Sequence, residues 1–249
     1  MTQPVAIITG AAQGIGRRTA ELLAERGYRL ALIDLKEPPI EGALTHIGDI
    51  TDESEINAFA ERVFEKYGRA DVLVNNAGIS HISPAEKIPV ADYRRVLEVN
   101  LVAPFLLCKV FGEKMLEARC GSIVNVASIA GLAGVSDRAA YNASKHGLIG
   151  LTRTLAAEWG GRGVRVNAVC PGWVKTEMDH VDQAKGTYTD ADITDRIPMA
   201  RFATPDDIAR AIAFLADDAQ SSFINGHALS VDGGWATDGS WESLRLSKR

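Results

Sequence analysis

The stretch that decides the fold is TGAAQGIG, residues 9–16, which joins the short apolar run Val5–Thr9 to a helical pattern near residues 14–26. Glycine permits a positive φ and lets a phosphate approach the backbone closely. The helix that follows offers N–H groups without partners and the positive end of its dipole. A tight turn without a ligand is the alternative, but a strand, this turn and a helix in order favour a pyrophosphate site. Its predicted members are Gly10, Gln13, Gly14, Ile15 and Gly16.

Outward from this turn, short apolar runs alternate with longer helical patterns. We predict strands at Val5–Thr9, Tyr28–Asp34, Leu44–Gly48, Val72–Asn75, Ser122–Ala127, Val164–Val169 and Ala228–Val231. Helical patterns lie near residues 14–26, 52–67, 92–118, 140–159 and 205–216. Strands rich in Val, Ile and Leu on both faces are typical of a parallel sheet covered by helices. The prediction is an α/β fold: a doubly wound (Rossmann) parallel sheet of about seven strands with helices on both faces.

Residues 1–249 suit a single catalytic domain, with three unusual segments. The connection 35–48 contains Pro38 and Pro39 and is short for a crossover helix, so we predict a loop or a single turn. The polar segment 174–204 is long for a loop in a compact domain, so we expect it to be either functional or disordered. The tail 236–249 is either a frayed terminus or a segment that docks at a subunit interface.

Composition excludes several classes of protein. A net charge of −5 argues against a nucleic-acid partner. The chain has no apolar run of about 18 residues, so we expect no membrane helix, and no signal-type segment opens it. Cys108, Cys120 and Cys170 show no CxxC spacing, and the histidines show no ligand spacing, so neither a disulfide framework nor a metal site is expected. We expect a cytoplasmic protein.

An acidic residue at the end of the second predicted strand bears on the cofactor. Asp34 can accept hydrogen bonds from the adenine ribose hydroxyls and would repel a 2′-phosphate. Leu35 follows where an arginine would favour a phosphate, and Gln13 is uncharged. Lys36 is close enough to weaken this preference, but a solvated lysine is the simpler interpretation. The prediction is NAD rather than NADP.

A second group of residues points to proton transfer. Tyr141 and Lys145 lie four residues apart in a helical pattern and share one face. An ammonium beside a phenol favours the phenolate and lowers its pKa, so the tyrosine can exchange a proton with an alcohol near neutral pH. Ser128, Asn75–Gly78 and Pro171–Gly172 follow three predicted strands and reach the same sheet edge, where ligands bind in doubly wound folds. A surface Tyr–Lys pair, the alternative, does not explain this convergence.

Together these residues resemble the short-chain dehydrogenase/reductase family in its single-domain branch. The matching segments occur in the family's order over nearly the whole chain: TGAAQGIG (9–16), Asp34, Asp49, NNAG (75–78), Asn100, Ser128, YNASK (141–145), PGWVKT (171–176) and VDGG (231–234). The short 35–48 connection departs from the family pattern, so we expect an adenine pocket that is shallower or more exposed.

The resemblance implies a role for each matching residue. Tyr141 would be the general acid/base, Lys145 would lower its pKa and bind the nicotinamide ribose, and Ser128 would hydrogen-bond the substrate oxygen. Asn100 would hold a water that links Lys145 to solvent. Other cofactor contacts would come from Leu35, Asp49, Ile50, Asn76, Ala77, Gly78, Pro171, Gly172, Val174 and Thr176. Residues 177–200 would be a substrate lid within the wider segment 174–204, and a homotetramer or homodimer is expected.

Substrate specificity is harder to predict. Candidate substrate contacts are Ser80, His81, Ser136, Arg138 and Trp173, with Met178 and His180 in the lid. Each of the polar residues could instead be an ordinary loop residue. His81 and Arg138 would suit a polyhydroxylated or anionic small molecule.

The expected function is therefore an NAD-dependent oxidoreductase that interconverts a secondary alcohol and a ketone, on a polyol, sugar or sugar acid. A 3-oxoacyl-thioester reductase acting on acyl carrier protein is the enzymatic alternative. A catalytically idle NAD-binding regulator is a third hypothesis, which the intact set of Asn100, Ser128, Tyr141 and Lys145 disfavours.

Overall fold

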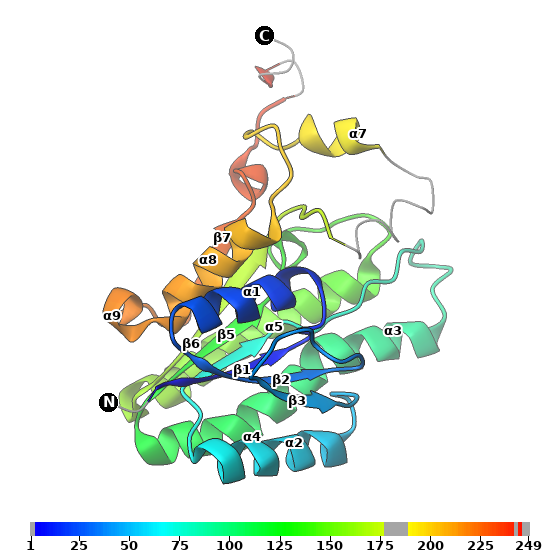
Figure 1. Ribbon diagram of the computed structural model, residues 1–249. Coiled ribbons are helices and arrows are strands. Elements are labelled where there is room, and N and C mark those ends of the chain that lie inside the picture. The colour runs from blue at the N-terminus through cyan, green and yellow to red at the C-terminus, as the bar shows by residue number, and fades with distance from the viewer. Residues whose placement is uncertain (1–2, 177–188, 242–243, 246–249) are drawn as a thin grey trace.

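A single sheet of seven parallel strands organises the molecule (Figure 1). The computed structural model describes residues 3–176, 189–241 and 244–245. The strands lie in the order β3-β2-β1-β4-β5-β6-β7, and every pairing is parallel. Their bounds are β1 (Val5–Thr9), β2 (Arg29–Asp34), β3 (Leu44–Ile47), β4 (Val72–Asn75), β5 (Gly121–Val126), β6 (Val164–Pro171) and β7 (Ala228–Val231). The predicted doubly wound sheet is confirmed. The strand order reverses between β1 and β4, and such a switch point leaves a crevice at the carboxyl ends of the strands.

Helices cover both faces of this sheet. Their bounds are α1 (Gly14–Glu25), α2 (Glu53–Tyr67), α3 (Val90–Leu97), α4 (Ala103–Ala118), α5 (Ala139–Trp159), α7 (Asp190–Thr194), α8 (Pro205–Ala216) and α9 (Asp218–Ser221). Within β1, Val5 and Ile7 pack with the apolar faces of α2, α4 and α5, whereas Ala6 and Ile8 pack with α1 and α8. Because successive strand residues point to opposite faces, the continuous apolar run of β1 supplies both cores.

The predicted helix over residues 92–118 is wrong in one respect. The segment is helical throughout, but a π-helical turn, Glu98–Val102, separates α3 from α4. Such a turn inserts one residue into a helix without ending it. The apolar pattern predicted the helix, but it does not distinguish one inserted residue from the continuous α-helical spacing.

The connection between β2 and β3 contains no helix, as predicted. Residues 35–43 form bends and a turn around Pro38 and Pro39, and β3 then pairs with β2 in parallel. The prolines and the shortness of the segment account for this, because a crossover helix needs about ten residues with free N–H groups.

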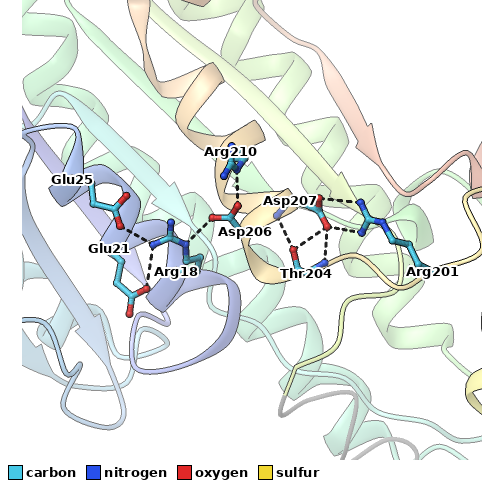
Figure 2. Close-up of polar contacts among 8 residues, drawn as sticks. All are labelled: Arg18, Glu21, Glu25, Arg201, Thr204, Asp206, Asp207 and Arg210. Atoms are coloured by element: carbon cyan, nitrogen blue, oxygen red, sulfur yellow. Dashed lines mark hydrogen bonds and ion pairs between the residues drawn. The ribbon is translucent and has the colours of Figure 1, made fainter.

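An ion pair joins α1 to α8 over the sheet (Figure 2). The Arg18 side chain on α1 contacts Glu21 and Glu25 on its own helix, and its Nε donates to Asp206 Oδ1 of α8 at 2.8 Å. The hydrogen bonds to Glu25, Asp206 and Glu21 raise the pKa of the Arg18 guanidinium above its ordinary value. The two helices lie side by side in Figure 1, so this pairing holds together segments that are far apart in the sequence.

The predicted lid is described in part. Residues 177–188, which include Met178 and His180, lie outside the described residues. Beyond them, α7 is a single turn with a Thr189–Asp192 capping box, and Lys175 Nζ lies 2.6 Å from Asp190 Oδ1. The start of the predicted tail is anchored, because Arg196 Nη1 contacts Asp238 Oδ2 at 3.1 Å. None of the helices in the described ranges combines the length and apolar character needed to span a bilayer.

Candidate active site

The carboxyl ends of six strands, β1 to β6, open into one cleft of about 440 Å³, and Asp49 after β3 is among its lining residues. Gly10 follows β1, Asp34 ends β2, Asn76 follows β4, Ser128 follows β5 and Pro171 ends β6, and all of them line it. The cleft therefore crosses the sheet at the switch point between β1 and β4, where a dinucleotide binds in this architecture.

The glycine-rich turn forms the centre of the cleft. Gly10 has a φ of +67°, and a Cβ atom on it would lie 2.8 Å from Ala77 Cα, so only glycine fits there. Asn76 Nδ2 donates to the carbonyls of Thr9 and Gly10, each at 3.0 Å, which joins the ends of β1 and β4. The first turn of α1 has no side-chain cap, and its N–H groups remain for an anion. This cradle fits the pyrophosphate of a dinucleotide.

Gly16 packs against the glycine-rich turn and does not line the cleft. A Cβ atom on Gly16 would lie 2.0 Å from Gly10 O and 2.4 Å from Asn76 Nδ2. Glycine here lets α1 approach the turn, and the predicted direct contact of Gly16 with the cofactor stays a prediction.

Two carboxylates mark the end of the cleft near β2 and β3. Asp34 accepts hydrogen bonds from the backbone N–H of Ala12 at 2.9 Å and of Lys36 at 3.1 Å, so its position is fixed. Asp49 accepts from Arg95 Nη2 at 2.8 Å and from Thr51 N at 2.9 Å. Burial raises the pKa of the Asp49 carboxyl, but the hydrogen bonds from Thr51 and Arg95 outweigh it and leave that pKa below its usual value.

The opposite end of the cleft carries the acid–base residues. Tyr141 and Lys145 lie one helical turn apart on α5, and Lys145 Nζ is 5.5 Å from the centroid of the Tyr141 ring. Lys145 is 4% exposed, and its Nζ donates to Val126 O at 2.8 Å. Burial lowers the pKa of the Lys145 ammonium to about 8. Ser128, the residue after Ala127, caps the short turn Ile129–Gly131 by accepting from Ala130 N at 3.1 Å.

Asn100 lies behind the cleft, in the middle of the π-helical turn. Its Nδ2 donates to Ile79 O and its Oδ1 accepts from Ile79 N, both at 2.9 Å. The same Nδ2 lies 3.1 Å from Ser144 Oγ on α5. Asn100 is fully buried and does not line the cleft. Its amide thus holds the chain after Gly78 against α5, and the predicted water relay stays a prediction.

The substrate residues predicted from sequence divide into two sets. Ser80, Arg138 and Trp173 line the cleft, whereas His81 and Ser136 do not. The His81 ring lies 3.9 Å from the Asp92 carboxylate, outside the lining residues, and Ser136 is exposed in the turn before α5. His81 and Ser136 were predicted because each lies close in sequence to a motif residue. The motif does not determine the direction in which such neighbouring side chains point.

Most predicted site residues meet in the cleft. Those that line it are Gly10, Gln13, Gly14, Ile15, Asp34, Leu35, Asp49, Ile50, Asn76, Ala77, Gly78, Ser80, Ser128, Arg138, Tyr141, Lys145, Pro171, Gly172, Trp173, Val174 and Thr176. The sequence prediction missed Arg95, whose side chain reaches Asp49 from α3. Nothing in the local sequence distinguishes Arg95 from a solvated arginine on a helix. It also missed the apolar lining residues Ile79, Val99, Ile129 and Val135.

A dinucleotide cleft with a buried lysine and a tyrosine at one end suits the paired transfer of a hydride and a proton. The class of protein it defines is a nicotinamide-dependent oxidoreductase. Comparison with known proteins agrees: a family model described as enoyl-(acyl carrier protein) reductase matches residues 10–236. The chain belongs to the short-chain dehydrogenase/reductase family, as its motifs predicted, and is an enzyme that acts on CH–OH groups.

Three similar proteins illustrate the range of the family. The chain is 43% identical over 242 residues to D-threitol dehydrogenase of Mycolicibacterium smegmatis (strain ATCC 700084 / mc(2)155), covering 93% of this chain and 92% of that one. It is 38% identical over 241 residues to the 3-oxoacyl-[acyl-carrier-protein] reductase FabG of Thermotoga maritima (strain ATCC 43589 / DSM 3109 / JCM 10099 / NBRC 100826 / MSB8), covering 92% and 96%. The solved structure of ElxO with NADP bound superposes with a TM-score of 0.89 at 32% identity, covering 95% of this chain and 100% of that one.

Proposed function

We propose that this enzyme oxidises a secondary alcohol of a polyol, sugar or sugar acid to the ketone, with NAD as the hydride acceptor. The observation that carries the proposal is the meeting of Ser128, Tyr141 and Lys145 at one end of a dinucleotide cleft. The similarity to a tetritol dehydrogenase supports a polyhydroxylated substrate.

In this proposal the protein positions the alcohol and handles its proton. Ser128 Oγ hydrogen-bonds the substrate oxygen, and the phenolate oxygen of Tyr141 accepts the proton as the substrate O–H bond breaks and the C=O bond forms. Lys145, held at Val126 O, supplies positive charge near the phenol ring and favours its phenolate. A dinucleotide held by the turn of residues 9–16 and by Asp34 would supply the hydride acceptor, so the two electrons and the proton would both be accounted for.

The preference for NAD is supported by Asp34. Its carboxylate is held by Ala12 and Lys36 N–H groups at the end of β2, where it would repel a 2′-phosphate. The neighbouring cation Arg95 pairs with Asp49 at 2.8 Å. Since like charges in contact cost several kcal/mol, kcat/KM should be at least about tenfold higher with NAD than with NADP. Asp34→Ser should reduce this ratio, and a wild-type enzyme that works better with NADP contradicts the assignment.

The second candidate substrate is a 3-oxoacyl thioester, which the similarity to FabG supports. Lys175 lies between two residues that line the cleft and pairs with Asp190 of α7, which begins with the exposed acids Asp190 and Asp192. These acids do not suit an acidic carrier protein, because like charges oppose docking. Reduction of acetoacetyl thioesters at a higher kcat/KM than oxidation of any polyol would favour this candidate.

We also propose a homodimer or homotetramer. Val102 and Phe105, where the π-helical turn meets α4, are 36% and 47% exposed, and contact with a second copy would cover them. Light scattering during size-exclusion chromatography tests this; a monomeric mass at micromolar concentration contradicts it.

The central test is to incubate the purified enzyme with NAD and a panel of polyols, sugars and sugar acids while recording reduced nicotinamide. Activity with a member of the panel supports the dehydrogenase. Absence of turnover with the panel, and also with ketones and reduced cofactor, contradicts it and leaves an NAD-binding regulator.

A further inference from the structure

Three polar side chains form a hydrogen-bonded ring at the β3 end of the cleft. Arg95 on α3 donates through Nη2 to Asp49 Oδ2 at 2.8 Å and through Nη1 to Thr51 Oγ1 at 2.7 Å. Thr51 Oγ1 in turn donates to Asp49 Oδ1 at 2.8 Å. Arg95 and Asp49 both line the cleft, although they lie 46 positions apart in the sequence. The hydrogen-bonded ring therefore joins α3 to the chain after β3 at the proposed cofactor site.

The directions of these hydrogen bonds follow from the chemistry of the groups. A guanidinium only donates, so Thr51 Oγ1 accepts from Arg95 and has its own proton left for Asp49 Oδ1. Oδ1 also accepts from the Thr51 backbone N–H at 2.9 Å. A carboxylate oxygen accepts about two hydrogen bonds. Within the described part of the chain, Oδ1 is thus fully used, whereas Oδ2, which Arg95 holds, has one acceptor position left.

Apolar side chains accompany this carboxylate in the cleft. Ile50 follows Asp49 directly and Val99 lies four residues after Arg95; both line the cleft, and each is 6% exposed. Burial alone would raise the pKa of the Asp49 carboxyl, but the hydrogen bonds from Thr51 and Arg95 keep that pKa below its usual value. The site thus offers an ionised carboxylate, balanced by Arg95, within an apolar lining. This arrangement suits a flat, uncharged ring that carries a hydrogen-bond donor.

We propose that Arg95 is a positioning residue, which holds Asp49 Oδ2 so that its remaining acceptor position receives the exocyclic amino group of adenine. The family resemblance implies a cofactor contact for Asp49, and the hydrogen-bonded ring adds Arg95 as the residue that orients it. The enzyme then discriminates between nucleotide bases, since hypoxanthine has a carbonyl oxygen in place of the amino group and would set one acceptor against another. The inference rests on the proposed dinucleotide cofactor but not on the substrate.

Binding of two reduced dinucleotides tests the discrimination without turnover. NADH and reduced nicotinamide hypoxanthine dinucleotide differ only in the base, and the fluorescence of the reduced nicotinamide reports the binding of both. Hydrogen bonds to a charged group are worth about tenfold to a hundredfold in affinity. Because the Asp49 side chain is 38% exposed, we expect the lower end of this range, with a wild-type Kd about tenfold lower for NADH than for its hypoxanthine counterpart.

Substitutions on α3 assign the effect to Arg95. Arg95→Met removes both donors and should raise Kd for NADH about fivefold to tenfold, while Kd for the hypoxanthine counterpart changes by less than about twofold. Arg95→Lys keeps the charge but not the planar fork that reaches Asp49 and Thr51 together, so it should fall between wild type and Arg95→Met. Arg94→Met is the matched control: Arg94 is exposed on the same helix and does not line the cleft, and neither Kd should change.

A double-mutant cycle tests whether Arg95 acts through Asp49. In an Asp49→Ala background, adding Arg95→Met should change Kd for NADH by less than about twofold, because the group that Arg95 orients is gone. Thermal unfolding without cofactor reports whether each variant is folded. If Asp49→Ala is not, Asp49→Asn replaces it. The two Thr51 donors keep the amide oxygen at the Oδ1 position, so the amide N–H group takes the place of Oδ2 and the preference should turn towards hypoxanthine.

The outcomes separate this inference from the proposed function. Equal wild-type affinities for the two dinucleotides, an equal loss for both in Arg95→Met, or an undiminished effect of Arg95→Met in the Asp49→Ala background would overturn the role of Arg95. Tighter binding of NADPH than of NADH would contradict the NAD assignment alone, because both carry adenine, and the same comparison then uses NADPH and its hypoxanthine counterpart. Absence of turnover with every alcohol and ketone would contradict the dehydrogenase and leave the binding comparison in force.

Discussion

Lys145→Met should make the protein more stable while removing its activity. Lys145 is 4% exposed, and burial lowers the pKa of its ammonium from 10.5 to about 8. That difference corresponds to about 3 kcal/mol against the folded state wherever the lysine is charged. Methionine has a similar length and carries no charge, but it gives up the hydrogen bond to Val126 O, worth about 1 kcal/mol. The net gain at pH 7 is about 2 kcal/mol.

The gain should depend on pH in a defined direction. Between pH 8 and 10.5 the unfolded chain holds the Lys145 proton and the folded protein has lost it. Wild-type stability therefore rises with pH across this window relative to the variant. The advantage of Lys145→Met should be full below pH 8 and should shrink as the pH approaches 10.5.

Calorimetric unfolding of the protein without cofactor measures this effect. For a chain of this size, 2 kcal/mol corresponds to an increase in Tm of about 4–8 °C at pH 7. Subtracting the wild-type Tm from the variant Tm at each pH removes the contribution of groups that both proteins share. A variant less stable than wild type at pH 7, or a difference that does not change between pH 7 and 10, would refute the reasoning.

Four further substitutions, one of them a control, test other parts of the structure. Tyr141→Phe should lower kcat by about a hundredfold to ten-thousandfold with NAD affinity nearly unchanged; turnover within tenfold of wild type would exclude Tyr141 as the acid/base. Gly16→Ala should lower the free energy of unfolding by about 2–4 kcal/mol and weaken NAD binding, since its Cβ would overlap Gly10 O. Gly150→Ala, in open space on α5, should stabilise slightly by the same assay, and equal effects of the two would contradict the packing argument. Asp207→Asn should cost about 1 kcal/mol at pH 7, because Asp207 takes part in the capping box of α8. Hydrogen bonds from Arg201 and the Thr204 N–H hold the Asp207 carboxyl pKa below 3.8, so denaturant titrations should show this difference declining as the pH falls below 3.8, and a constant difference would contradict the assignment.

The parts of the fold that sequence could predict are those encoded locally. The apolar run of β1, the glycines of residues 9–16 and the spacing of Tyr141 and Lys145 each specify a conformation or a shared helix face within a few residues. Asp34 was predictable because the end of a strand fixes its place at the sheet edge.

The parts that could not be predicted depend on contacts between distant segments. Arg95 enters the cleft only because α3 lies across from the β3 end, where Asp49 holds its side chain. Arg138 and Ser80 are separated by 58 positions and meet only after β4 and α5 are in place. The outward position of Ser136, two residues before Arg138, likewise depends on the tertiary path of that turn.

The number of residues in the π-helical turn Glu98–Val102 determines how α3 and α4 are oriented relative to each other. In an α-helix each residue rotates the chain by about 100°, so one extra residue offsets the apolar stripe of α3 from that of α4 by about that angle. The apolar faces of the two consecutive helices can then pack against different neighbours: α3 packs on α5, and α4 packs on α2. Deleting one residue here would restore a uniform α-helix and turn Asn100 away from Ile79 and Ser144. In this segment the number of residues, as well as their identity, keeps the apolar faces of α3 and α4 directed at their packing partners.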